Sequence, residues 1–145
     1  MQALTKALSI IILLSSSFCA QSQEPQDRQD SEDYELPITL QALLETNGRG
    51  NFINLVQSGV LNQAYLLQSG HDNSIELAQV GLDNQANITQ YGDNNEVELL
   101  QVGERNQADI TQIGNDNLVQ LNQLGSANFS IEQIADGAAI TITQY

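Results

Sequence analysis

An eleven-residue unit repeats seven times without interruption between Asn51 and Ala127. The unit reads N-x-φ-x-φ-x-Q-x-G-x-x, where φ is an aliphatic residue or alanine, and we number its positions 1 to 11. Position 1 is always asparagine, position 7 glutamine and position 9 glycine. So strict a period is typical of a solenoid, in which each unit stacks on the one before it. The sequence therefore predicts a protein that works by stacking and not through a pocket.

Positions 3 and 5 are apolar in every copy, whereas positions 2 and 4 are mixed or polar. This period of two is typical of a β-strand with one buried face. Glycine at position 9, with the polar or small residues after it, has the composition of a turn. We therefore predict an all-β fold, a β-solenoid (β-helix) whose 22-residue strand-turn-strand coils form two facing parallel sheets. The predicted core residues are Ile53, Leu55, Ala64, Leu66, Ile75, Leu77, Ala86, Ile88, Val97, Leu99, Ala108, Ile110, Val119 and Leu121.

The asparagines at position 1 and the glutamines at position 7 share the strand face of the core residues. A buried amide without a partner is costly, but amides stacked at a strand spacing of ~4.8 Å bond to those above and below, as in cross-β fibrils. We interpret them as a polymerisation ladder. Its members are Gln57, Gln68, Gln79, Gln90, Gln101, Gln112, Gln123, Gln133, Gln144, Asn51, Asn62, Asn73, Asn84, Asn95, Asn106 and Asn117.

The repeat weakens at both ends of the solenoid. Residues 39–50 keep the apolar spacing but lack the asparagine and glutamine. Residues 128–145 keep the strand pattern, with Ala127 and Ala138 where asparagine is expected. We predict one solenoid domain over residues 39–145, about four to five coils long, with regular repeats over 51–127 and a divergent last coil over 128–145.

Two segments precede the solenoid. Lys6, the apolar stretch from Ala7 to Leu14 and the small residues after it predict a secretory signal peptide over residues 1–22. Acylation of Cys19 is an alternative interpretation of the same segment. Residues 23–38 are acidic and almost free of aliphatic side chains, which predicts a disordered leader. The leader is either a solubilising tail or an export tag.

The composition argues against several classes of function. The net charge is −14, with 18 acidic residues against 4 lysines and arginines, which argues against binding to nucleic acid or anionic lipid. No further hydrophobic segment predicts a membrane span. The single histidine, His71, lies in a predicted turn with no nucleophile and base to form a catalytic set around it. We therefore predict no enzyme, no cofactor and no metal.

Acidic residues recur in the predicted turns and at outward strand positions. A calcium-binding β-solenoid is a remote alternative, because stacked aspartates can bind calcium, but the glycine-rich nonapeptide of such proteins is absent. We interpret the acids as gatekeepers that keep the chain soluble, and we expect acid to speed assembly because carboxylates stacked in a fibre should have raised pKa values. The gatekeepers are Asp72, Glu76, Asp83, Asp93, Glu96, Glu98 and Asp116.

The repeat resembles that of the curlin family, the subunits of bacterial curli fibres, which carry the motif S-x5-Q-x-G-x-x-N-x-A-x3-Q. The segments 57–68, 79–90 and 101–112 match its Q-x-G-x-x-N-x-A-x3-Q part, and asparagine stands where the family often has serine. The resemblance covers residues 51–145. It implies an extracellular functional amyloid of adhesion and biofilm matrix, a cell-surface fimbria of a Gram-negative bacterium. The implied partners are further copies, a homologous curlin joined through strand edges, an outer-membrane secretion pore and the cell surface.

The family has a major subunit that builds the fibre and a minor subunit that nucleates it at the cell surface. Turns with a single glycine, such as Gly81-Leu82-Asp83-Asn84, and the divergent last coil favour the minor subunit. The alternative is the major subunit, of which the terminal Gln144-Tyr145 is reminiscent.

Overall fold

The computed structural model describes residues 9–15 and 40–145, and within these ranges it consists of strands joined by turns. No helix in these ranges is long and apolar enough to cross a membrane. The acidic leader and most of the signal peptide lie outside the described residues. The strands are β1 (Ser9–Ser15), β2 (Leu40–Arg49), β3 (Phe52–Val60), β4 (Asn62–His71), β5 (Ser74–Leu82), β6 (Gln85–Tyr91), β7 (Glu96–Glu104), β8 (Gln107–Ile113), β9 (Leu118–Gly125), β10 (Asn128–Ile134) and β11 (Ala139–Gln144).

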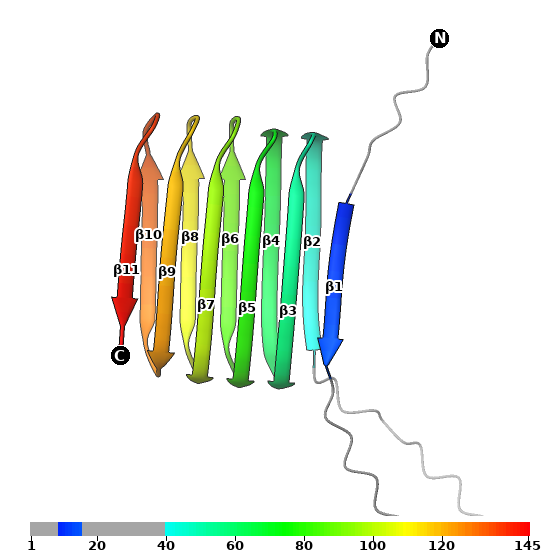
Figure 1. Ribbon diagram of the computed structural model, residues 1–145, viewed down its shortest axis with the longest axis vertical. Coiled ribbons are helices and arrows are strands. Elements are labelled where there is room, and N and C mark those ends of the chain that lie inside the picture. The colour runs from blue at the N-terminus through cyan, green and yellow to red at the C-terminus, as the bar shows by residue number, and fades with distance from the viewer. Residues whose placement is uncertain (1–8, 16–39) are drawn as a thin grey trace, which may run out of the picture.

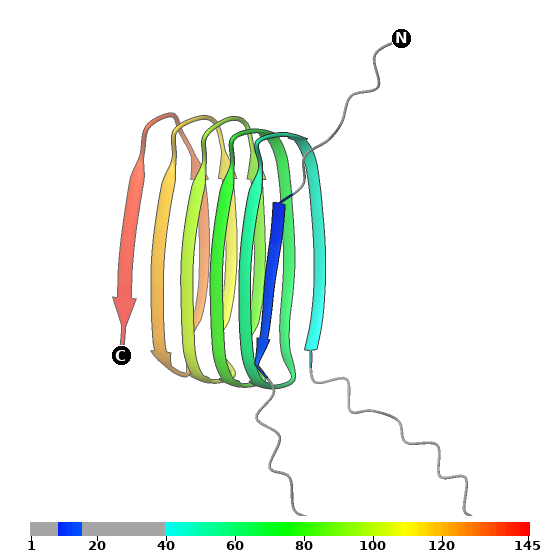
Figure 2. The same cartoon turned by 45° about the vertical axis from the view of Figure 1, so that its right-hand side comes forward.

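The strands form two parallel sheets that face one another (Figures 1 and 2). The odd-numbered strands form a sheet in the order β1-β3-β5-β7-β9-β11, and the even-numbered strands form a sheet in the order β10-β8-β6-β4-β2. From β2 onward, the chain therefore alternates between the sheets and completes one coil with each pair of strands. The prediction of an all-β solenoid with two parallel sheets is confirmed, with about five coils.

Strand pairing aligns equivalent positions of the repeat along the whole stack. Ile75 pairs with Val97, Ala86 with Ala108 and Gln79 with Gln101. The turn before β10 is one residue shorter than the others, yet β10 still pairs with β8 in the same register. The missing residue therefore shortens the turn and leaves the strand register unchanged. This matters because a one-residue slip in a strand would exchange its buried and exposed faces.

The core is a thin layer between the sheets, made by positions 3 and 5. All of the predicted core residues are at most 3% exposed. Ile131 joins them at 8%, while Leu44, Phe129, Ile140 and Ile142 are only partly buried. Full burial of one aliphatic side chain contributes roughly 1.5–3 kcal/mol. The side chains of the first and last coils gain less of this stabilisation, because no further coil covers them.

Strand β1 comes from the segment predicted to be a signal peptide. It pairs in parallel with β3 over seven residues, from Ser9 opposite Phe52 to Ser15 opposite Ser58. The outer edge of β3 therefore accepts a parallel strand.

The turns need backbone conformations that most residues avoid. Glycine at position 9 has a positive φ throughout, and a Cβ on Gly81 would lie 2.0 Å from the main-chain oxygen of Gly103. Position 11 is left-handed too, although in the internal turns its residues are not glycine: Leu61, Asp72, Asp83, Asn94, Arg105 and Asp116. Aspartate and asparagine tolerate this region, whereas Leu61 and Arg105 are strained there by roughly 1 kcal/mol.

The strain at Arg105 predicts a stabilising substitution. Arg105→Asn should raise the free energy of unfolding by about 0.5–1 kcal/mol, because asparagine adopts a left-handed φ more readily than arginine. The matched control is Asp83→Asn, where φ is 57° against 56° at Arg105 and aspartate already tolerates the conformation. The measurement is the urea midpoint of both variants at moderate salt. Equal shifts in the two variants would contradict the strain argument.

Candidate assembly interface

The glutamines at position 7 form two hydrogen-bonded columns along the solenoid. In the odd-strand sheet, each Nε2 donates to the Oε1 one coil further on: Gln57 to Gln79, Gln79 to Gln101 and Gln101 to Gln123, at 2.5–2.9 Å. In the even-strand sheet, the same bonds join Gln68, Gln90, Gln112 and Gln133 at 2.9–3.0 Å. All of these side chains are buried. Each column therefore ties successive coils together through the interior.

The same Nε2 groups also join the two sheets across the core. Gln68 donates to the main-chain oxygen of Phe52 at 3.0 Å, and Gln90 to that of Ser74 at 3.1 Å. The acceptor in each case begins the strand of the facing sheet. A buried polar atom without a partner costs about 1–3 kcal/mol, and these second bonds satisfy the remaining amide proton.

The asparagines at position 1 form two further columns at the turns. Asn73 donates its Nδ2 to Asn51 Oδ1 at 3.2 Å and to the main-chain oxygen of Gly92 at 2.8 Å. Asn51 Oδ1 also accepts the main-chain N–H of Asn73. The same side-chain bonds join Asn95, Asn117, Asn62, Asn84 and Asn106 to their neighbours in their columns. Their donors point towards the N-terminal end, opposite to those of the glutamines, so the two kinds of column have opposed polarity.

Gln144 departs from the predicted ladder. Gln123 does not donate to it but to the main-chain oxygens of Gln107 and Ala127, at 3.1 and 2.9 Å. Ala127 stands where the other turns have asparagine, which leaves its carbonyl within reach of Gln123. Gln144 donates instead to the main-chain oxygen of Tyr145. Within one chain, therefore, this column ends at Gln123.

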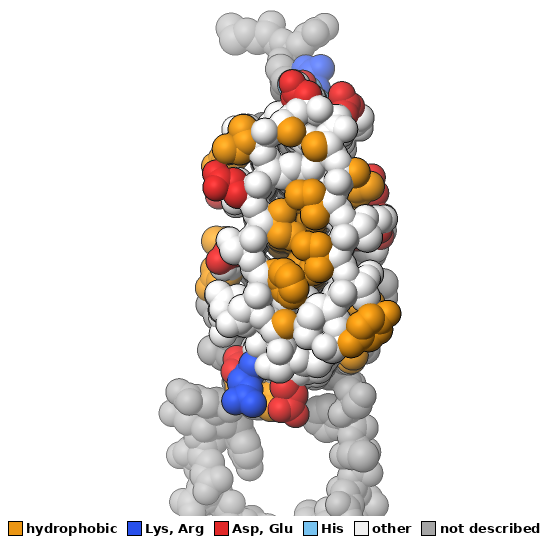
Figure 3. Space-filling view, turned by 90° about the vertical axis from the view of Figure 1, so that its left-hand side faces the viewer, with side chains coloured by type: hydrophobic (Ala, Val, Ile, Leu, Met, Phe, Trp, Pro, Cys, Tyr) orange, Lys and Arg blue, Asp and Glu red, His pale blue; other side chains and the backbone are white. Residues whose placement is uncertain are grey.

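Both ends of the stack leave hydrogen-bonding capacity unused. Gln57 Oε1 and Gln68 Oε1, the first acceptors of the two glutamine columns, and Gln144 Oε1 in the last strand are buried without a partner. Most buried acceptors in folded proteins are paired. Figure 3 looks onto the C-terminal end and shows a strip of hydrophobic side chains framed by main chain. At the C-terminal end, apolar side chains of the core are therefore exposed between the two sheets.

The main chain of β11 also presents a free edge. Alternate residues of a parallel strand direct their N–H groups to opposite sides. Leu118 N–H donates to the Ala138 oxygen, so Ala138 and every second residue after it direct their main-chain groups towards β9. Thr141 and Thr143 alternate with these residues, and their N–H groups therefore point away from β9. Proteins usually cover or charge such an edge, yet in the described part of the chain no strand lies beyond β11.

The gatekeeper acids lie on the outside of the solenoid, in two settings. Glu76 and Glu98 are partners on adjacent strands, and Glu96 lies at the start of the same strand as Glu98. Asp72, Asp83 and Asp116 occupy left-handed turn positions. No group of three or more histidines, cysteines or acids that could hold a metal occurs among the described residues.

A column of side chains along one set of turns was not predicted. Asp93 Oδ1 accepts the main-chain N–H of His71 at 2.8 Å and lies 3.0 Å from His71 Nδ1. Asn115 and Asp136 continue the column by accepting the main-chain N–H groups of Asp93 and Asn115. The available signal was position 10, which is polar in each of these turns, whereas the other set mixes Val60 and Leu82 with Glu104 and Ser126.

Removing one rung of a glutamine column should destabilise the fold. Gln90→Ala leaves Gln112 Oε1 and the Ser74 oxygen without their donor and deprives Gln68 Nε2 of an acceptor. At 1–3 kcal/mol per orphaned group, we expect a loss of roughly 3 kcal/mol or more in the free energy of unfolding. Gln85→Ala, on the outer face of the same strand, is the control and should cost less than about 1 kcal/mol. Similar losses in both variants by urea titration would contradict a structural role for the column.

The contact between His71 and Asp93 predicts a pH effect. The hydrogen bond from the His71 side chain, and then the one from its main chain, lower the pKa of Asp93 below its usual 3.8. A carboxyl with a lowered pKa in the folded state contributes stability above its unfolded pKa, and this is lost as pH falls through the folded value. Asp93 therefore contributes stability to the folded chain above about pH 4. Asp93 is one of the predicted gatekeepers, and its lowered pKa in the single chain is opposite in direction to the rise expected for those acids in a fibre.

The measurement is an NMR titration of the Asp93 carboxyl in the folded chain. His71→Ala should move the pKa of Asp93 back towards its ordinary value and flatten the rise of stability between about pH 3 and pH 5. An unchanged titration in the variant would show that His71 does not cause the shift.

The repeat geometry agrees with a comparison of the chain with known families. The family model of the curlin associated repeat matches residues 48–81, 81–114 and 92–125, which together span more than half of the chain. Comparisons with curated proteins and with solved structures gave no match. The matched residues carry the central coils, with their asparagine and glutamine columns. The chain belongs to the curlin family.

Proposed function

We propose that this curli fibre subunit polymerises end on, with the last coil of one copy pairing to the first coil of the next. The observations that support this are the uncovered edge of β11, the parallel strand that the outer edge of β3 already accepts, and the unpaired buried oxygen Gln57 Oε1. Strand β11 would pair with β3 of the next copy, and β10 with β2. Addition of a strand to a sheet edge gains main-chain hydrogen bonds along its whole length.

The two ends match in register. Extending the pairing seen within the chain sets Ile140 against Ile53, Ile142 against Leu55 and Gln144 against Gln57. Gln144 Nε2 could then donate to the unpaired Gln57 Oε1, so the interrupted column would continue into the next copy. In the other sheet, Gln133 would meet Thr46, whose hydroxyl is also able to hydrogen bond.

Removal of the signal peptide would make the chain competent to assemble. Strand β1 occupies the edge of β3 that the next subunit needs. Cleavage after residue 22 would remove it. The acidic leader over residues 23–38 would then serve as an export tag for the outer-membrane pore, and the mature chain would act outside the cell in adhesion and biofilm matrix.

We further propose that the chain is the minor subunit, which nucleates the fibre at the cell surface. Two observations support this choice over the major subunit. Internal turns carry strained residues such as Leu61 and Arg105, and glycine occupies position 11 only at Gly50 and Gly137. The last coil is also poorly covered, because Phe129, Ile140 and Ile142 are partly exposed. In the copy at the base of the fibre, the divergent last coil would contact the cell surface and not a further copy, and the stacked Glu76 and Glu98 would restrain premature assembly.

Proline at the free edge of β11 should stop end-on growth without harming the fold. Thr141→Pro/Thr143→Pro removes two N–H groups that face away from β9, so no main-chain bond within the chain is lost. We expect a folded chain that forms no fibres by amyloid-dye fluorescence and electron microscopy. Added in small amounts, it should also terminate growing fibres of the unmodified chain.

The control is Thr141→Val/Thr143→Val, which keeps the β-branched shape and the N–H groups. It should polymerise at nearly the rate of the unmodified chain. Fibres of normal length from the proline variant would contradict the end-on model. If the proline and valine variants both fail to assemble, the loss of assembly is caused by removal of the threonine hydroxyl groups.

The nucleation role has its own test. A small amount of this chain should shorten the lag of a separate major curlin, and a truncation after Leu124 should remain soluble and detach from cells. If the chain forms abundant fibres alone and leaves the lag of a second curlin unchanged, the major-subunit assignment replaces the minor one.

A further inference from the structure

The turns that follow the even-numbered strands carry a column of side chains at position 10 whose charge changes along the solenoid. We call it the turn column, and in chain order its members are Arg49, His71, Asp93, Asn115 and Asp136. The basic side chains belong to the first two coils, and an acid belongs to the last. Position 10 of the other turns shows no such gradient, since it carries Val60, Leu82, Glu104 and Ser126.

The main chain of these turns keeps the same hydrogen bonds at both ends of the turn column. The Arg49 oxygen accepts the Asp72 N–H at 2.9 Å, and the Asn115 oxygen accepts the Gly137 N–H at 2.9 Å. Asp136 Oδ1 also accepts the Asn115 N–H at 2.7 Å. The shorter turn before β10 therefore does not displace the last turn, and Asp136 has the same place in its coil as Arg49 has in the first.

Arg49 and Asp136 are both exposed, and in the described part of the chain the one ion pair joins two other members of the column, His71 and Asp93. Acidic side chains lie at these turns on the C-terminal end, at the top of Figure 3. The pair of His71 and Asp93 shows what position 10 allows, because Nδ1 and Oδ1 lie 3.0 Å apart across adjacent coils. An arginine side chain is longer than histidine and keeps its charge at all ordinary pH values.

We infer that Arg49 of one copy forms an ion pair with Asp136 of the copy before it, and that this pair helps each end to recognise its partner. The inference rests on the proposed end-on assembly, in which β10 lies beside β2 of the next copy. Extending the register of β10 with β8 and of β2 with β4 sets position 10 of the last turn against position 10 of the first. A strand spacing of about 4.8 Å is within the reach of an arginine, whose hydrogen bonds to a carboxylate are strong.

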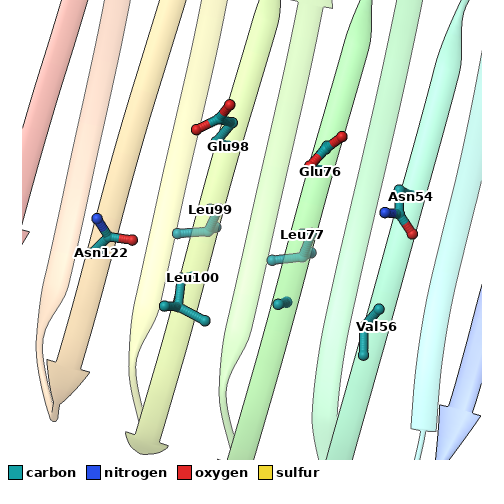
Figure 4. Close-up of a pocket in the computed structure, with 9 residues that line it drawn as sticks. Asn54, Val56, Glu76, Leu77, Glu98, Leu99, Leu100 and Asn122 are labelled. Carbon is teal, nitrogen blue, oxygen red and sulfur yellow. The ribbon is translucent and has the colours of Figure 1, made fainter.

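The same register also brings two acids together. Glu132 meets Glu45 at position 6 of the even-strand sheet, where like charges repel. Strands β3 and β11, which meet in the other sheet, carry no acidic or basic side chain. Glu76 and Glu98 lie on β5 and β7, inside the stack and not at its ends (Figure 4). Arg49 is therefore the cation of the described residues that offsets acids at the junction.

A pair of this kind acts mainly on the rate of assembly. Exposed ion pairs add little to affinity, whereas opposite charges at an interface raise the rate of association and suppress wrong partners. A homologous curlin would be accepted at the Arg49 end if it carries an acid at position 10 of its last turn. The pair thus supplies a criterion for partner choice that the repeated amides, which are alike in every coil, do not provide.

Seeded elongation tests the pair. Folded mature chains are added to fibre seeds of the unmodified chain, and growth is followed by light scattering at low salt and at about 0.5 M salt. We expect Arg49→Glu to slow elongation about three- to fivefold at low salt, and salt to remove most of the difference. Arg105→Glu makes the same change in net charge in an exposed turn inside the stack, and it should slow elongation by less than half as much.

Reversal of the acid separates the pair from the overall charge. Asp136→Arg makes the chain less negative, so general repulsion between copies predicts faster growth, whereas loss of the pair predicts growth about three- to fivefold slower. The double variant Arg49→Glu/Asp136→Arg keeps the net charge of the unmodified chain and restores opposite charges at the junction. It should grow on its own seeds to within about twofold of the unmodified rate. Circular dichroism of each variant checks that the strands are retained.

Two results would overturn the ion pair: equal slowing by Arg49→Glu and Arg105→Glu, or a folded double variant that grows no faster than the two single variants. If these results occur while Thr141→Pro/Thr143→Pro still blocks growth, end-on stacking stands and only the pair is removed. Normal fibres from that proline variant would remove the end-on model and the ion pair together.

Discussion

A buried amide without a partner destabilises a protein. This chain buries an amide side chain at two positions of every regular unit, the asparagine at position 1 and the glutamine at position 7. Within a single coil the glutamine and asparagine side chains have too few partners, since each bonds to its equivalent one coil away. The repeat must therefore keep the same residue at the same place in each coil. Strand register follows from that requirement, because a slip of one residue would leave a whole column unpaired.

The same requirement explains why the ends are incomplete. A column of identical amides cannot satisfy its own first acceptor and last donor, and a solenoid cannot cover its own terminal strands. Gln57 and Gln68 show the consequence in their unpaired Oε1 atoms. Replacement of asparagine by Ala127 and Ala138 lets Gln123 and Gln133 turn to main-chain oxygens, which partly closes the C-terminal end. The chain thus forms a stack of coils in which no strand of the described residues covers β11.

Much of this architecture could be predicted from the sequence, because positions 1, 3, 5 and 7 have a period of two and each identity recurs every eleven residues. Stacking fixes the rest of the interior once the strands are placed. The turns were harder to predict. The left-handed φ of Leu61 and Arg105 has no compositional signal, since glycine, asparagine or aspartate is normally expected there. The column from His71 to Asp136 depends on side chains at a variable position, where the repeat carries no information. The missing bond between Gln123 and Gln144 accompanies a local change in the divergent last turn, where Ala127 replaces asparagine and accepts from Gln123.

The claim that amide columns continue from one copy to the next can be tested in fibres by solid-state NMR. Half of the chains would carry ¹⁵N in their glutamine side chains and the other half ¹³C, so that contacts between the two labels arise only between copies. End-on stacking predicts an intermolecular contact between Gln144 Nε2 and the Gln57 side-chain carbonyl at hydrogen-bond distance, about 3 Å between nitrogen and oxygen. Contacts only between identical residues, such as Gln57 with Gln57, would mean that whole chains stack in register as flat strands, and they would contradict the solenoid as the unit of assembly.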